Sequence, residues 1–327
     1  MLLGRFLTSL FGNFLQYCKT VNSAWGLMHN QDQTGLAIIL SLIALMLFDG
    51  MGLIIKYLSN NYSATELTAW RNLFGLLPTL IALWSSKKWR SNGQSLKIRQ
   101  WKLALLRGVI VTFAQLSFYI SLGLMAFATA STISYSTALF TTAFAIPILG
   151  ERVGWVRWSA VLIGFLGVLM VIEPSAEGFS SNAFFPLAAA VFYALVGVTA
   201  RLFDDDISSA VINLYSSFSS IVGAVLIAYF WNGFNTITSA TDMLGIILMG
   251  GLGGTAVLLL VMSYRMTEHS NLAPFSYFGI PLSFVLGWLF FNEVPWNTLF
   301  PGGLLIAAAG LLIIWRERSQ GKTNSYR

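Results

Sequence analysis

The stretch that decides the fold reads "SYSTALFTTAFAIPILGE", from Ser134 to Glu151, and a second version, "SYFGIPLSFVLGWLFFNE", runs from Ser276 to Glu293. In both, a Ser-Tyr pair stands the same number of residues before a Glu, and the residues between them are mostly apolar. Each copy is followed by a Trp and then by a run of small and apolar residues. The chain therefore contains an internal repeat of hydrophobic helices.

The composition indicates a membrane protein. Of the 327 residues, 56% are hydrophobic and only 10% are charged, whereas soluble domains carry about 25% charged residues. The only cysteine is Cys18, so no disulfide can form within the chain. The net charge of +6 does not point to nucleic acid, because membrane proteins collect basic residues in their cytoplasmic loops.

The apolar runs predict how often the chain crosses the membrane. A helix needs about 20 mostly apolar residues to span a bilayer. On this basis we predict an all-α integral membrane protein with ten transmembrane helices, at residues 36–58, 66–85, 101–123, 127–148, 155–173, 183–202, 208–231, 243–264, 271–291 and 297–315. With the N-terminus inside, every Lys and Arg lies on the inner side except Lys56, Arg71 and Arg107. We therefore expect both termini to be cytoplasmic.

The repeat divides these helices into two sets of five, at residues 35–174 and 182–316. Because five is odd, the second set begins on the opposite side of the membrane, so the two repeats have inverted topology. Glu151 then faces the cytoplasm, and Glu293 faces outward. Inverted repeats are typical of transporters in which one site opens alternately to each side.

The two tails carry no functional assignment. We expect residues 1–34 to be a cytoplasmic tail that either forms an interfacial amphipathic helix or includes residues upstream of a true start at Met28. Residues 317–327 form the second cytoplasmic tail.

Four stretches carry a resemblance to a known family. They are "TELTAWRNLFGLL" (65–77), "LLRGVIVTFAQLSFYISLGLMAFATAS" (105–131), "PILGERVGWVRWSAVLIGFLGVLMVIEP" (147–174) and "FFNEVPWNTLFPGGLLIAAAGLLIIW" (290–315). The chain resembles the drug/metabolite transporter superfamily, with two EamA-type five-helix domains, and is similar to its bacterial amino-acid, metabolite and S-adenosylmethionine carriers. The second domain departs from the pattern, with "FNEVPW" in place of Gly-Glu-Arg. The resemblance implies a central cavity lined by helices 1, 3, 4, 6, 8 and 9.

Three charged residues lie inside predicted spans, where a charge is costly and usually faces a protein-lined cavity. Asp49 lies near the predicted midplane, about 13 Å from the outer end of its helix at 1.5 Å per residue. It either carries a proton or binds a substrate amine, or it forms a salt bridge to Arg71 or Arg107. Arg71 cannot readily lose its proton, so it needs an anion: Asp49, Glu66 or a substrate carboxylate. Arg107 either contacts substrate or anchors its helix at the inner leaflet.

Polar residues add further candidates for substrate binding. Gln115 and Tyr119 share one helix face, and hydroxyl groups at membrane depth need partners, which a bound substrate can supply. Small polar residues also serve simply to let helices pack closely. The remaining candidates are Ser134, Tyr135, Tyr193, Ser276 and Tyr277.

Other classes of protein fit the sequence less well. The two histidines, His29 and His269, form no metal-ligand pair, and no nucleophile motif is present, so we expect no enzyme, metal or cofactor. A channel would show charge rings or carbonyl filters. The sequence predicts a secondary transporter of the bacterial inner membrane for a small polar organic metabolite, with an amino acid as first choice and S-adenosylmethionine or a riboflavin-like vitamin as alternatives. A proton, an exchange substrate and a homodimer partner are left open.

Overall fold

The computed structural model describes residues 33–85, 89–90, 96–149, 155–172, 181–199, 202–203, 207, 209–231, 233–237, 239–266, 275, 278–293, 300–309 and 311–312. Residues 1–32 of the predicted tail at 1–34, the predicted tail at 317–327 and the residues Ser276, Tyr277 and Glu151 lie outside the described residues. Within those ranges the secondary structure is helical and contains no strand. The expectation of an all-α fold is confirmed for this part of the chain.

The helices follow the predicted apolar runs closely. They are α2 (Gln33–Leu58), α3 (Ala64–Ser85), α5 (Trp101–Leu124), α6 (Phe127–Ser134), α7 (Thr137–Leu149), α8 (Trp155–Ile172), η1 (Ser181–Ala183), α9 (Phe184–Thr199), α10 (Ser209–Trp231), α11 (Ala240–Met266) and α13 (Gly279–Phe291), and residues 302–309 are also helical. Among the described residues, five stretches are long and apolar enough to cross a membrane: Gly35–Leu58, Trp101–Leu124, Ser181–Thr199, Ala210–Trp231 and Ala240–Leu260. Ten crossings remain a prediction.

One predicted helix, at 127–148, is divided in two. The backbone N–H of Ser136 and its hydroxyl both donate to the carbonyl oxygen of Ile133, at 3.1 and 2.6 Å. The Thr137 hydroxyl donates to the carbonyl oxygen of Ser134 at 2.7 Å. Short polar side chains that bond the backbone compete with regular helix bonds, and α6 ends at Ser134.

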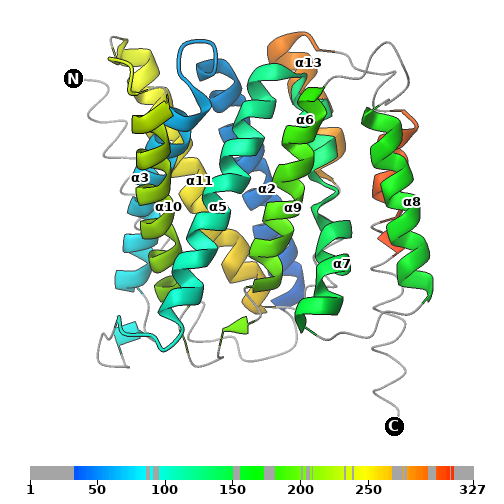
Figure 1. Cartoon of the computed structure of the whole chain (residues 1–327), viewed down its shortest axis with the longest axis horizontal. Coiled ribbons are helices and arrows are strands. Elements are labelled where there is room, and N and C mark those ends of the chain that lie inside the picture. The colour runs from blue at the N-terminus through cyan, green and yellow to red at the C-terminus, as the bar shows by residue number, and fades with distance from the viewer. Residues whose placement is uncertain are drawn as a thin grey trace.

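The helices stand side by side in one bundle (Figure 1). Helix α11 packs on α2 and α3, α5 packs on α9 and α10, and α10 also contacts α3. Glycines allow the closest of these approaches: a Cβ on Gly254 of α11 would lie 2.6 Å from the carbonyl oxygen of Gly75 in α3. Small residues at such crossings are typical of membrane helices.

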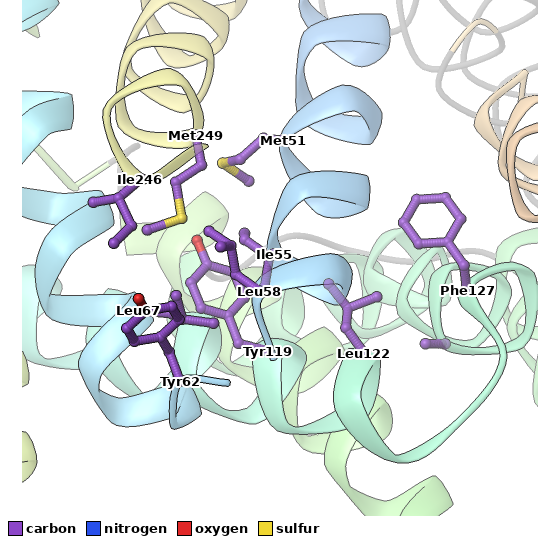
Figure 2. Close-up of a cluster of buried hydrophobic side chains, with 11 residues drawn as sticks. Met51, Ile55, Leu58, Tyr62, Leu67, Tyr119, Leu122, Phe127, Ile246 and Met249 are labelled. Carbon is purple, nitrogen blue, oxygen red and sulfur yellow. The ribbon is translucent and has the colours of Figure 1, made fainter. Parts of the chain in front are cut away.

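The core and the outer surface are both apolar. A buried cluster joins α2, α3, α5 and α11, and Figure 2 shows the Tyr119 ring projecting from α5 among Met51, Leu58 and Met249. The outer face of α10 leaves Phe218 63% and Phe230 79% exposed. Large apolar side chains exposed in such number mark a surface that contacts something other than water, here the lipid.

Candidate substrate-binding site

Asp49 is a buried acid inside α2. It is 7% exposed, and its Oδ2 atom has no hydrogen-bond partner. Neither Arg71 nor Arg107 forms an ion pair with it, so the salt bridges considered from the sequence are absent. The neutral Tyr135 hydroxyl lies within electrostatic range of its carboxylate. Burying a carboxylate without a partner is costly, which makes Asp49 a candidate for binding a cation.

Polar groups without partners gather at the break between α6 and α7. The hydroxyl oxygens of Ser131, Thr132 and Ser134 are buried and form no hydrogen bond. Tyr135 directly follows them and is half-buried. Broken helices at membrane depth occur where the backbone lines a cavity or is covered by protein. Of these residues, Tyr135 lies within electrostatic range of Asp49 in α2.

Tyr135 also links the two quoted stretches of sequence. Its hydroxyl occupies the position that a Cβ on Gly279 would need. Gly279 begins α13 and lies three residues after Ser276. The first Ser-Tyr pair therefore contacts the second stretch directly, and only glycine leaves room for that ring.

A second polar cluster surrounds Arg71, which is 8% exposed. Its Nη1 donates to Asn72 Oδ1 at 3.1 Å, and Asn72 Nδ2 donates to Gln115 Oε1 at 2.7 Å. Arg71 Nε and the Tyr119 hydroxyl are buried without a partner. Arg71 interacts electrostatically with both Tyr119 and Tyr193.

This second cluster joins α3, α5 and α9, and it includes a residue that the sequence analysis missed. Asn72 follows Arg71 directly in "AWRNLF". The signal that could have identified it was a second polar residue, next to Arg71, inside a predicted span.

Arg107 differs from Arg71 because the protein supplies its partners. Its Nε donates to the carbonyl oxygen of Val196 at 3.4 Å, and its Nη1 donates to Ser216 Oγ at 3.3 Å. Ser216 in turn donates to the carbonyl oxygen of Ala104 at 3.0 Å. These bonds tie α5 to α9 and α10, which favours a scaffold role for Arg107.

An ion pair joins the two halves of the chain. Lys56 Nζ lies 2.9 Å from Glu293 Oε1 and donates to the carbonyl oxygen of Met125 at 2.7 Å. Glu293 Oε2 accepts the backbone N–H of Phe127 at 2.7 Å. Both residues were predicted on the outer side, but not as a pair.

Comparison with known proteins now identifies the first half. Residues 35–173 match the EamA-like transporter family. These residues resemble an EamA transporter domain, and the resemblance noted from the sequence is confirmed for them.

Characterised relatives are named as transporters of different compounds. An S-adenosylmethionine uptake transporter of Rickettsia bellii is 27% identical, over 80% of this chain and 88% of its own. A pseudopaline exporter of Pseudomonas aeruginosa is also 27% identical, over 83% of this chain and 93% of its own. A riboflavin transporter of Rhizobium johnstonii is 30% identical over 52% of this chain and 55% of its own. One solved structure has a TM-score of 0.62 at 17% identity, over 88% of this chain and 99% of its own, which shows a shared fold alone.

Proposed function

We propose that this protein is a secondary transporter of the bacterial inner membrane that moves a small polar organic metabolite by alternating access. Its ten helices form two inverted five-helix repeats, residues 35–174 and 182–316, with both termini in the cytoplasm. The EamA domain and the names of the relatives support transport. None of those names is that of a plain amino-acid transporter, so our choice of substrate depends on the residues of the site.

The packing of the helices supports the inverted repeat. In the proposed repeat, α2, α3 and α5 correspond to α9, α10 and α11. The contact of α2 with α11 then has its counterpart in α9 with α5, and that of α3 with α11 has its counterpart in α10 with α5. If a two-fold axis relates the halves, each contact between a helix of one half and a helix of the other must have such a counterpart. Alternating access depends on this symmetry between the halves.

The buried Oδ2 of Asp49 without a partner is the observation that carries the substrate assignment. A substrate amine would satisfy this carboxylate, and the hydroxyls at the α6–α7 break would accept or donate further bonds. An amino acid is our first choice. S-adenosylmethionine, which carries an amino-acid group, fits the same site, and a riboflavin-like vitamin is the alternative that the Rhizobium johnstonii relative favours.

Uptake into proteoliposomes tests this proposal, with a panel of amino acids, S-adenosylmethionine and riboflavin. Asp49→Asn should reduce uptake of the transported compound at least about tenfold, the factor that 1.4 kcal/mol of lost interaction represents. Asp242→Asn is the matched control: Asp242 is 8% exposed, but the Tyr62 hydroxyl donates to its Oδ2 at 3.0 Å, and an amide oxygen can accept that bond. Wild-type uptake by Asp49→Asn would remove Asp49 from the mechanism. Single-channel current steps would show that the protein is a channel and not a carrier.

A further inference from the structure

The Arg71 cluster has an unbalanced charge. A guanidinium keeps its proton at any ordinary pH, and a buried charge requires a partner. The Nη1 atom of Arg71 donates to the neutral Asn72, and its Nε has no acceptor among the described residues. No carboxylate of the described residues lies within ion-pair distance of it.

The two nearest acids by sequence form no ion pair with Arg71. Glu66 in the first turn of α3 accepts the backbone N–H and the side-chain amide of Asn235, at 3.0 and 3.4 Å. Asp49 belongs to the other cluster, with Tyr135, and its Oδ2 has no partner. The described residues therefore hold a fixed positive charge in the interior without supplying the anion.

The groups around this charge can bind an anion. Tyr119 is 1% exposed, and its hydroxyl is buried and forms no hydrogen bond. Tyr193 is half-buried in α9, in the second half of the chain, and α9 packs on α5, the helix that carries Tyr119. The bond to Gln115 fixes the side-chain amide of Asn72, and that amide in turn accepts the bond from Arg71 Nη1. The Nε atom of Arg71 is left without a partner.

We propose that Arg71, with the hydroxyls of Tyr119 and Tyr193, binds a carboxylate of the transported metabolite. The planar guanidinium matches a carboxylate better than it matches a single acceptor. This inference rests on the proposed function and adds a second, anionic requirement to the cationic one at Asp49. The substrate therefore carries both an amine and a carboxylate, which a riboflavin-like vitamin does not.

Two glycines of α11 offer a test that keeps the charge. A Cβ on Gly253 would lie 2.5 Å from Met51 Sδ, 2.9 Å from Arg71 Nε and 3.0 Å from Arg71 Nη2, whereas a Cβ on Gly251 would meet nothing within 4 Å. Gly253→Ala therefore displaces the flexible ends of both Met51 and Arg71, because the three nearest atoms all belong to side chains. Gly251→Ala, two residues away in the same helix, is the matched control.

The experiment measures binding by the protein in lipid nanodiscs, from ligand-induced thermal stabilisation. The probes are the amino acids and S-adenosylmethionine, and each is compared with the corresponding amine that lacks the carboxylate. We expect the acid to bind at least about tenfold more tightly than its amine. Arg71→Gln and Gly253→Ala should weaken binding of the acid and leave binding of the amine unchanged. Arg71→Lys should keep part of the preference, and Gly251→Ala all of it.

The outcomes separate this inference from the proposed function. Equal binding of acid and amine by the wild type, or an unchanged preference in Gly253→Ala, would overturn the carboxylate site and leave a transporter standing. Binding and uptake of riboflavin alone would do the same. If no probe binds and none is taken up, the proposed function and this inference fail together. Should Arg71→Gln fail to fold, Gly253→Ala carries the test.

Discussion

The ammonium group of Lys56 lies 2.9 Å from the carboxylate of Glu293, and the two residues come from opposite halves of the chain. Each also binds one end of a helix: Lys56 donates to the carbonyl oxygen of Leu122 in the last turn of α5, at 3.3 Å, and to that of its C-cap residue Met125, at 2.7 Å. Glu293 accepts the first N–H of α6. Both placements agree with the helix dipole, which favours cations at a C-terminus and anions at an N-terminus.

Breaking this pair should lower stability. With side-chain exposures of 13% and 22%, the pair is largely shielded from water. Glu293→Gln or Lys56→Met should each reduce the free energy of unfolding by about 1.5–3 kcal/mol, the range for hydrogen bonds to charged groups. Thermal unfolding in detergent measures this. The double variant should lose less than the sum of the two losses, because the residues are coupled; simple additivity would mean that the pair contributes nothing.

Proton coupling gives a second prediction. If Asp49 binds and releases a proton during transport, a protonophore should abolish concentrative uptake by the wild type in proteoliposomes that hold a pH gradient. Asp49→Asn should show only residual uptake, equal with and without the protonophore. If wild-type uptake does not depend on the pH gradient, Asp49 binds the substrate but transfers no proton.

The contact between α3 and α11 gives a third prediction. A Cβ on Gly254 would lie 2.6 Å from the carbonyl oxygen of Gly75, and backbone cannot move aside as a side chain can. Gly254→Ala should therefore lower the free energy of unfolding by about 1–3 kcal/mol, as overpacking usually does. Thermal unfolding beside Gly251→Ala checks it, because that position is free of contacts. Equal stability of both variants would show that the helices separate easily here.

The helices were predictable because hydrophobic length is a local property of the sequence. The range 101–123 became α5 (Trp101–Leu124), and 208–231 became α10 (Ser209–Trp231). The break after Ser134 was missed, because hydropathy does not record a hydroxyl that competes for a backbone carbonyl.

Pairings between distant residues could not be predicted. The sides of the membrane on which Lys56 and Glu293 lie follow from the positive-inside rule, but their contact depends on how the halves pack. The bond from Asn72 to Gln115 likewise requires α3 and α5 to meet at one depth. The Asp49–Arg71 salt bridge was a reasonable expectation from charge alone, and it is absent because each residue belongs to a different polar cluster.

The contact of Tyr135 with Gly279 gives the last prediction. The ring of Tyr135 lies against the first residue of α13, and its hydroxyl lies within electrostatic range of Asp49. Tyr135→Phe keeps the ring and removes the hydroxyl, so stability should change by less than about 1.5 kcal/mol, the net value of one hydrogen bond, while uptake falls. Gly279→Ala should instead displace the whole ring and lower both uptake and stability. Gly197→Ala is the control, because a Cβ at Gly197 meets nothing within 4 Å. If Tyr135→Phe transports at the wild-type rate, the hydroxyl has no part in binding, and Tyr135 serves only to pack the α6–α7 break against α13.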